Sequence, residues 1–240
     1  MSGPGGIKSI GIVACSAEGA ALCYKTICNE ASKSMGAHAH PDVGLHGHSL
    51  AAYVECLDRG DLQGVAALML SSASKLEAAG AEVLICPDNT IHSAMHLVKP
   101  RCRLPWLHIA EVVARTAHER GYRRIGITGT KWLVASEVYP EKFAMLGLQA
   151  VRPRDEERDE INRFIMEELV QGIFSTAAVR YFQSVFARMK ADGCDAVVLG
   201  CTEIPLIMND ANSPLPTLDS TRLLARAALQ FAVETIHAMA

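Results

Sequence analysis

The sequence predicts an α/β protein built from two similar parallel-sheet domains related by a pseudo-two-fold axis, with a ligand site in the cleft between them. The main observation is an internal repeat between residues 79–90 and residues 192–203. Each copy has a glycine that ends a helix, an acidic residue, an apolar run, and a reactive side chain followed by small polar groups. The reactive position lies eight residues after the glycine in both copies, and it is Asp88 in the first and Cys201 in the second.

Two further matches support duplication of a whole domain. Residues 10–12 (Ile-Gly-Ile) recur at 125–127, and a Leu-Pro-x-Leu then Ala-Arg-x-Ala pattern, at 104–107 and 114–117, recurs at 215–218 and 225–228. The offset is far longer than the roughly 20–50 residues of solenoid repeats. We therefore expect a first domain of residues 1–110 plus 219–240 and a second domain of residues 111–218.

Strands and helices alternate along the chain, which favours parallel sheets in both domains. Apolar, β-rich runs predict strands at residues 7–15, 43–46, 83–86, 104–108, 124–128, 148–151 and 196–200. Helical spacing predicts helices at residues 19–35, 48–57, 62–79, 91–98, 111–120, 134–146, 161–172, 176–191 and 221–238, with the acidic stretch 155–160 leading into one of them.

Composition excludes several classes of function. A net charge of −3 offers no electrostatic attraction for nucleic acid or an anionic membrane, and no apolar run approaches the roughly 18 residues needed to span a bilayer. The N-terminus does not read as a signal peptide. The eight cysteines include no Cys-x-x-Cys, and Cys15, Cys86 and Cys194 lie in apolar runs, as small hydrophobic residues do. We expect a reducing, cytoplasmic location.

Ligands in parallel sheets bind beyond the carboxyl ends of the strands, where Ser16, Asp88, Thr130 and Cys201 are predicted to lie. His48 follows another predicted strand and could reach the same site. A thiol at a strand-to-helix turn can be stabilised as a thiolate, which favours chemistry at Cys201. Asp88 has two open interpretations, because aspartate is also a common N-cap before a helix.

The sequence offers no cofactor site. Residues 126–131 are too short for a dinucleotide fingerprint or a P-loop, and no lysine has a pyridoxal-like setting. His92 and His96 share one helical face but lack the glutamate and the third ligand of a zinc site. We expect no metal and no cofactor.

Nearly the whole chain resembles the cofactor-independent aspartate/glutamate racemase superfamily. The specific string is Leu-Gly-Cys-Thr-Glu-Ile-Pro-Leu at 199–206, and weaker matches in the family's order lie at 76–81, 89–92, 107–110, 129–130 and 167–172. In that family two residues, usually both cysteines, flank the substrate Cα and exchange its proton. Cys201 matches the second, whereas Asp88 replaces the first.

The resemblance also implies roles for neighbouring residues. Positions that hold substrate carboxylates correspond to Asn89, Thr90, Thr130 and Thr202, and a position near the substrate amino group corresponds to Glu203. The family's Gly-rich turn after the first strand reads Ala-Cys-Ser-Ala here, and Leu133 stands where a threonine is common.

These features predict an isomerase, a pyridoxal-independent racemase of aspartate, glutamate or a related acidic substrate. One alternative is a cofactor-free decarboxylase in which Cys201 alone protonates the product. Another is a non-catalytic dicarboxylate-binding homologue. The expected partner is a small acidic substrate, with no nucleic acid or membrane, and we expect a homodimer.

Overall fold

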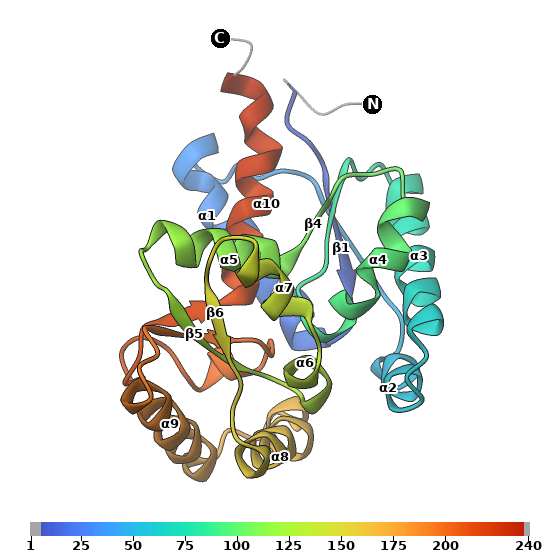
Figure 1. The fold of residues 1–240 in the computed structure, drawn as a ribbon. Helices are drawn as coiled ribbons and strands as arrows, with labels where there is room; N and C mark the ends of the chain where they lie inside the picture. Colours follow the sequence, from blue (N-terminus) through green and yellow to red (C-terminus); the bar gives the residue numbers. More distant parts are fainter. Residues whose placement is uncertain (1–5, 238–240) are drawn as a thin grey trace. The chain divides into compact units, whose positions relative to one another are not determined.

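The computed structural model, which describes residues 6–237, contains two four-stranded sheets in which every strand pair is parallel (Figure 1). The prediction of an α/β protein with two parallel sheets is therefore confirmed. The first sheet has the order β2-β1-β3-β4 and comprises β1 (Ile10–Ala14), β2 (Val43–Gly47), β3 (Val83–Ile85) and β4 (Trp106–Leu107). The second has the order β6-β5-β7-β8 and comprises β5 (Arg124–Thr128), β6 (Gln149–Val151), β7 (Ala196–Leu199) and β8 (Thr217–Asp219).

The chain divides into two compact units. It passes from one unit to the other at the first turns of two helices, one beginning at Ile109 and the other at Ser220. The first unit holds the residues up to Ile109 together with those from Thr221 onward, and the second unit is Ala110–Ser220. The C-terminal helix therefore belongs to the first unit, where the backbone N–H of Lys8 donates to Ala232 at 3.1 Å and Arg226 pairs with Glu30 at 2.8 Å.

Helices cover both sides of each sheet (Figure 1). In the first unit, α1 and α10 lie on one side, and α3 and α4 lie on the other. In the second unit, α8 and α9 lie on one side, with α5 and α7 on the other. The α-helices are α1 (Ala17–Met35), α2 (Leu50–Asp58), α3 (Leu62–Ala78), α4 (Met95–Val98), α5 (Ile109–Glu119), α6 (Lys131–Ala135), α7 (Val138–Ala144), α8 (Asp155–Arg163), α9 (Thr176–Ala191) and α10 (Ser220–His237).

The repeated Ile-Gly-Ile has the same packing reason in both units. A Cβ on Gly11 of β1 would lie 2.6 Å from the Leu84 side chain, and a Cβ on Gly126 of β5 would lie 2.6 Å from the sulfur of Met189. A side chain at either position would have to push these neighbours aside, so glycine suits the close packing against the central strand. The sequence match therefore reflects two equivalent, closely packed strands.

The acidic residue of the repeat also has one role in both copies. Glu82 accepts a hydrogen bond from the backbone N–H of Ser9 at 2.9 Å, and Asp195 accepts from the backbone of Arg123 and Arg124 at 2.7 and 2.9 Å. Each carboxylate thus satisfies backbone donors at the start of its unit's central strand, which would otherwise lack partners.

The repeated prolines occupy equivalent ladder positions. Leu84 of β3 donates its backbone N–H to Pro105, and Val197 of β7 donates to Pro216, both at 2.9 Å. Proline can accept in a ladder but cannot donate. The strand β8, which the sequence analysis did not predict, follows from the second of these contacts.

Several predicted elements differ from the structure. The strand expected at 7–15 is shorter at both ends, and the strand expected at 104–108 shrinks to two residues. The helix expected at 91–98 begins as a 3-10 turn, η1 (Thr90–Ala94), and two further 3-10 turns are η2 (Lys99–Arg101) and η5 (Ile204–Leu206). The end of the last predicted helix, residue 238, lies outside the described residues.

Two of the differences have clear causes. The helix expected at 134–146 is broken into α6 and α7, because the Ser136 hydroxyl turns back to the Leu133 carbonyl and Pro140 favours the first turn of a new helix. The acidic stretch 155–160 lies within helix α8, because Glu157 accepts from the Arg154 backbone and carboxylates stabilise a helix N-terminus.

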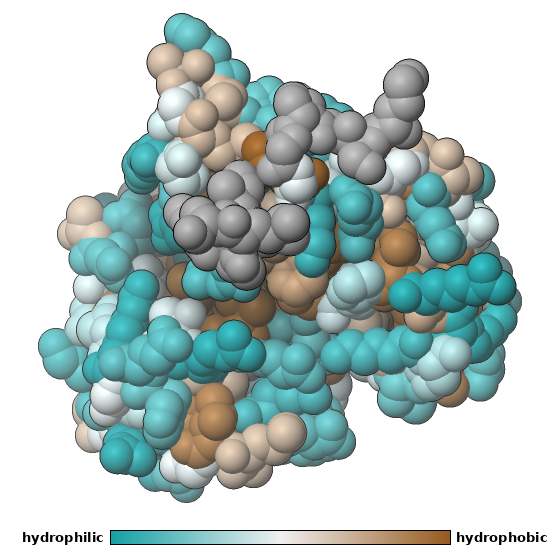
Figure 2. Space-filling view, turned by 90° about the horizontal axis from the view of Figure 1, so that it is seen from above, coloured by the Kyte–Doolittle hydropathy of each residue, from teal (hydrophilic) through white to brown (hydrophobic). Residues whose placement is uncertain are grey.

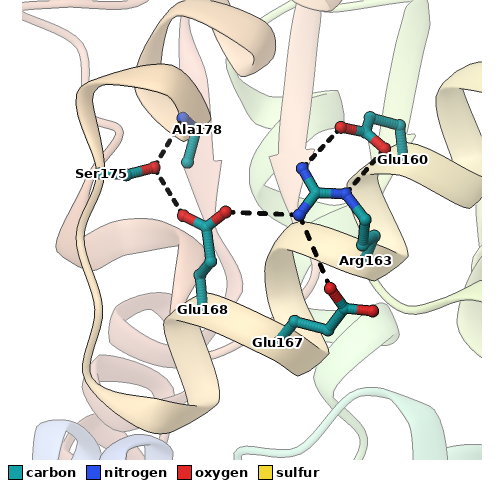
Figure 3. A network of polar contacts seen from close by, with 6 residues as sticks. All are labelled: Glu160, Arg163, Glu167, Glu168, Ser175 and Ala178. Carbon is teal, nitrogen blue, oxygen red and sulfur yellow. Dashed lines mark hydrogen bonds and ion pairs between the residues drawn. The ribbon is translucent and has the colours of Figure 1, made fainter.

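After α8 the chain forms a π-helix, η3 (Phe164–Glu168), and a 3-10 turn, η4 (Leu169–Gln171), instead of the predicted continuous helix. Figure 3 shows the polar network there, in which Arg163 contacts Glu160, Glu167 and Glu168. Glu168 accepts from the Ser175 hydroxyl at 2.5 Å, and Ser175 in turn caps α9. This network connects the irregular turn to the next helix.

Each unit has its own apolar core, and both centre on the strands of the repeat. In the first, Leu84 and Cys86 pack with residues of α3, and in the second, Val197 and Leu199 pack with residues of α9. Figure 2 shows one face of the molecule, where hydrophilic side chains dominate. Within residues 6–237, no helix is both long enough and apolar enough to cross a bilayer.

Candidate active site

The predicted reactive residues follow equivalent strand ends in the two units. Ser16 and Thr130 come after the central strands β1 and β5, and Asp88 and Cys201 come after β3 and β7. Since β1 pairs with β3, and β5 pairs with β7, each unit brings one hydroxyl and one reactive side chain to the same edge of its sheet.

Ser16 and Thr130 are both N-caps. The Ser16 oxygen accepts from the Gly19 backbone at 3.3 Å to begin α1, and the Thr130 oxygen accepts from the Leu133 backbone at 3.2 Å to begin α6. Capping uses the hydroxyl oxygen as an acceptor, and a hydroxyl is also a donor. A capping hydroxyl can therefore also donate to a carboxylate of a ligand.

The Asp88 side chain accepts backbone hydrogen bonds at the start of a helical turn, as a cap does, although Asn89 occupies the N-cap position. Its Oδ1 accepts from the backbone N–H groups of Thr90 at 3.0 Å and Ile91 at 3.4 Å, at the start of η1. Backbone donors stabilise the ionised form of a carboxylate. The contact fixes the position of the Asp88 carboxylate.

Cys86, two residues before Asp88, is the alternative thiol in the first unit, and its surroundings keep it protonated. The side chain is fully buried, and its sulfur donates to the Asp88 carbonyl oxygen at 3.7 Å. Burial raises the pKa of the Cys86 thiol well above its ordinary value, and the charge of Asp88 raises it further. Asp88 is therefore the better candidate for the reactive group of this unit.

Cys201 lies in the corresponding turn of the second unit, with 9% of its surface exposed. Its sulfur donates to Oε2 of Glu203 at 2.9 Å, and the Thr202 hydroxyl donates to the same oxygen at 2.8 Å. Glu203 is buried as deeply as Thr202, each with 2% of its surface exposed. The Gly-Cys-Thr-Glu string thus places a thiol, a hydroxyl and a carboxylate in one buried cluster.

Gly200 allows this turn to approach its neighbour strand. Its backbone N–H donates to the Thr128 carbonyl at 2.9 Å, and a Cβ on this residue would collide with that same carbonyl oxygen. Because the obstacle is backbone, it cannot move aside as a side chain could. Glycine is therefore required immediately before Cys201.

The residues after Asp88 are also buried. Asn89 and Thr90 lie in the turn, and the His92 ring bonds through Nε2 to the Cys86 carbonyl at 3.0 Å. A carbonyl only accepts, so Nε2 carries a hydrogen. His96 bonds instead through Nδ1 to Ser93 at 3.1 Å. Within the described part of the chain, no group of three His, Cys, Asp or Glu side chains could hold a metal ion.

His48 follows β2, and its Nε2 is buried without a hydrogen-bond partner. Its ring meets the His46 ring edge-on at 5.2 Å. His46 contacts α3 through two bonds, from Nδ1 to the Ser72 hydroxyl at 2.9 Å and from Nε2 to the Lys75 ammonium at 3.0 Å. Burial lowers the pKa of His46, and the charges of Lys75 and His48 lower it further.

Sequence reasoning missed two features of these surroundings. The bonds of His46 join residues 26 and 29 positions apart, and no local pattern indicates them. The thiol–carboxylate bond had a signal, since a glutamate two residues after a turn cysteine can reach it, but the resemblance directed that glutamate to a substrate amino group.

Comparison with known proteins identifies the family of the chain. The model of one protein family, described as Asp/Glu/hydantoin racemase, matches residues 10–228. The chain belongs to this family. The resemblance seen in the sequence is thereby confirmed.

Solved structures of this family superpose over nearly the whole chain. A Yersinia pestis protein assigned provisionally as an Asp/Glu racemase has a TM-score of 0.86 at 29% identity, covering 95% of this chain and 100% of that one. An aspartate racemase homologue from Pyrococcus horikoshii has a TM-score of 0.81 at 26% identity, covering 94% and 99%.

Two relatives with a named activity match about two thirds of the chain. The broad-specificity amino-acid racemase RacX of Bacillus subtilis is 20% identical over 162 residues, 66% of this chain and 68% of RacX. A glutamate racemase of Koribacter versatilis is 28% identical over 174 residues, 68% of this chain and 57% of that enzyme.

Proposed function

We propose that the protein is a pyridoxal-independent racemase of aspartate, glutamate or a closely related acidic amino acid. The observation that carries the proposal is the equivalence of Asp88 and Cys201. Asp88 follows β3 and Cys201 follows β7, which occupy the same place in two sheets of the same strand order. The chain also belongs to the Asp/Glu/hydantoin racemase family. RacX and the Koribacter enzyme, named as racemases of amino acids, support this class of substrate.

In the proposed reaction Asp88 and Cys201 exchange the α-proton of the substrate. One side chain removes the α-proton, the electron pair stays on the substrate as a carbanion stabilised by its carboxylate, and the other side chain delivers a proton. Asp88, which two backbone donors keep ionised, starts as the base. Cys201, whose sulfur donates to Glu203, starts as the acid.

Substrate carboxylates would be bound by the hydroxyls at the same strand ends. Ser16 begins α1, a helix of 19 residues, and the N-terminus of a helix attracts anions. Asn89, Thr90 and Thr130 carry amide and hydroxyl groups that suit a carboxylate, and the Thr202 hydroxyl would exchange its bond to Glu203 for one to the substrate. Amide and hydroxyl donors of this kind suit the carboxylates of an acidic amino acid.

A single-cysteine decarboxylase is a second candidate, and one observation favours it. The two backbone bonds that hold Asp88 ionised also weaken it as a base, since free aspartic acid already has a pKa of about 3.9 against about 8.5 for cysteine. A decarboxylase needs no base on that side, because loss of carbon dioxide creates the carbanion that Cys201 then protonates.

Solvent-deuterium incorporation at Cα distinguishes these functions. Each enantiomer of aspartate and glutamate, and a panel of substituted malonates, would be incubated with the protein in D₂O and followed by proton NMR and chiral chromatography. A racemase replaces the α-proton and forms the other enantiomer. A decarboxylase instead converts a malonate into a deuterated monocarboxylate, and a binding protein changes neither. No exchange with any acidic amino acid would refute the proposal.

A further inference from the structure

The helix α6 is too short to hold its own position. It has five residues, Lys131–Ala135, whereas isolated helices shorter than about 12–15 residues are only marginally stable in water. Thr130 is its N-cap and one of the candidate carboxylate-binding residues. Whatever fixes the first turn of α6 therefore also fixes the Thr130 hydroxyl.

Side chains from the segment that follows β6 bind both ends of this helix. At its C-terminal end, the Arg152 guanidinium donates to the carbonyl oxygens of Val134 and Ser136 at 2.8 and 2.9 Å. At its N-terminal end, Oδ1 of Asn162 accepts from the backbone N–H of Lys131 at 3.0 Å. The first N–H groups of a helix have no partner within the helix, so Asn162 satisfies a donor that Thr130 does not.

Asn162 lies in α8, and the end of this helix is itself anchored (Figure 3). Arg163, the next residue, contacts Glu160 at 2.7 Å and Glu168 at 3.4 Å. Glu168 accepts from the hydroxyl of Ser175, the N-cap of α9. The end of α8 is thus connected to the next helix, which restricts the position of the Asn162 side chain.

The location of the Thr130 turn matters because this turn packs against the turn that carries Cys201. The backbone N–H of Gly200 donates to the Thr128 carbonyl at 2.9 Å, and a Cβ on Gly129 would lie 3.0 Å from the Gly200 carbonyl oxygen. Thr130 follows Gly129, and Cys201 follows Gly200. A displaced first turn of α6 would therefore change the position of the Thr130 hydroxyl relative to the thiol.

We propose that Asn162 is a positioning residue for Thr130, which holds the first turn of α6 so that the Thr130 hydroxyl can bind a substrate carboxylate. The inference rests on the proposed function for the identity of the ligand. The contact itself joins residues 31 positions apart, so no local pattern in the sequence indicates it. Without the amide oxygen, the Lys131 N–H loses its partner and the first turn of α6 should open more often.

A first test needs no substrate. Amide hydrogen exchange at Lys131 and Leu133 would be measured by NMR in the unmodified protein and in Asn162→Leu, which has a similar size but no acceptor. Exchange at Lys131 should become about fivefold faster, as expected for the loss of one hydrogen bond. Asn162→Asp keeps an acceptor and should restore the slower exchange. Unchanged exchange in Asn162→Leu overturns the inference.

Gln149→Leu is the matched control. Gln149 is another amide side chain of the second unit, and its Oε1 accepts from Arg124 at 2.9 Å at the start of β6, the edge of the sheet opposite to Thr130. This variant should leave exchange at Lys131 unchanged. Circular dichroism would show that each variant is folded, and Asn162→Ala, which adds no bulk, replaces Asn162→Leu if the latter does not fold.

The second test separates positioning from a merely structural role. Asn162→Leu should raise KM for the racemised amino acid about tenfold and change kcat by less than about twofold, because a bond to the substrate carboxylate is lost. A structural role would lower the folded fraction and leave KM unchanged. Because Asn162 acts through Thr130, the double variant with Thr130→Val should have the KM of Thr130→Val alone. Independent effects that add would overturn the inference.

Failure of the proposed function gives a different result. If neither aspartate nor glutamate is racemised, the racemase is refuted, and their affinities measured by isothermal titration calorimetry replace KM. Equal affinities in the unmodified protein and in Asn162→Leu, or no binding to either, then overturn the role of Asn162.

Discussion

At the scale of single residues, Asp88 and Cys201 differ in the partners that surround them. Two backbone N–H groups contact the Asp88 carboxylate, and a carboxylate oxygen contacts the Cys201 thiol. Backbone donors favour the anion of an aspartate, its ordinary state at neutral pH. A carboxylate acceptor favours the protonated thiol of a cysteine, which is also its ordinary state. Under the proposed function, Asp88 would start as the base and Cys201 as the acid.

Cys201→Ser should abolish α-proton exchange from both enantiomers. A serine hydroxyl fits the site and can still donate to Glu203, but it is a far weaker acid than a thiol. We expect the rate to fall by about 10²–10⁴, the usual contribution of a positioned acid or base. Proton NMR in D₂O measures the rate, and Cys86→Ser, at the buried thiol of the other unit, is the control. Exchange that survives in Cys201→Ser would contradict the assignment of Cys201.

Asp88→Asn tests whether the aspartate is more than a cap. Asparagine caps helices about as well as aspartate, so the free energy of unfolding should change by less than about 1 kcal/mol. It cannot accept the α-proton, so racemisation should fall by about 10²–10⁴. Asp88→Cys should raise racemisation, since it restores two thiols. Full activity in Asp88→Asn, measured from both enantiomers by chiral chromatography, would leave Asp88 as a cap only and favour the decarboxylase.

At the scale of elements, the end of β2 is tied to α3 by a titratable contact. The Lys75 ammonium can only donate, so His46 Nε2 accepts and Nδ1 carries the hydrogen toward Ser72. A protonated His46 has no lone pair for Lys75 and would face a second cation. This contact therefore needs neutral His46, in agreement with the lowered pKa of its ring.

Stability should consequently fall with pH in the acidic range. The pKa of His46 lies below 6.5 in the folded state, mainly because of burial, so below about pH 6.5 the unfolded chain binds a proton that the folded chain does not. Unfolding free energy then decreases until the folded pKa is passed. Urea titrations at pH 8, 6.5 and 5.5 should show a weaker pH dependence in His46→Asn than in the unmodified protein.

The matched control is His38→Asn. His38 is exposed and has a φ of 66°, a conformation that asparagine adopts readily. If His46→Asn and His38→Asn give the same pH dependence as the unmodified protein, the contact between β2 and α3 does not govern acid stability.

At the scale of the whole molecule, two helices belong to a different unit from the strand that precedes them. They are the helices that follow the two Leu-Pro-x-Leu strands. The helix α5 belongs to the second unit, although its strand β4 lies in the first, and α10 belongs to the first unit, although its strand β8 lies in the second. The repeated Ala-Arg-x-Ala places a fully buried alanine in each helix, Ala117 in α5 and Ala228 in α10.

A buried charge in either helix should therefore weaken one unit more than the other. Ala228→Asp places an unpaired carboxylate in α10 and should speed amide hydrogen exchange in β1–β4, the opposite half of the sequence. Ala117→Asp should do the same for β5–β8. Each variant is the control for the other, with exchange followed by mass spectrometry. Equal acceleration of both sheets by each variant would show that the units do not unfold separately.

The sequence by itself determined the class of the protein. Apolar runs of strand length alternate with helical spacing, and the repeat marks two sheets, because both patterns depend on residues close together in the chain. The Leu-Gly-Cys-Thr-Glu-Ile-Pro-Leu string pointed to the family that the comparison confirmed. Position alone also identified Asp88 and Cys201 as equivalent, since each lies eight residues after a helix-ending glycine.

Only the tertiary structure decided how side chains meet. It showed that Asp88 accepts backbone hydrogen bonds as a cap does, that Cys86 is buried beneath it, and that His46 reaches Ser72 and Lys75 on another helix. It also showed that the Cys201 thiol donates to the Glu203 carboxylate, a contact that their closeness in sequence allows but does not determine. Spacing limits which residues can touch, but the packing around a side chain selects its rotamer, and that packing comes from segments far away in the chain.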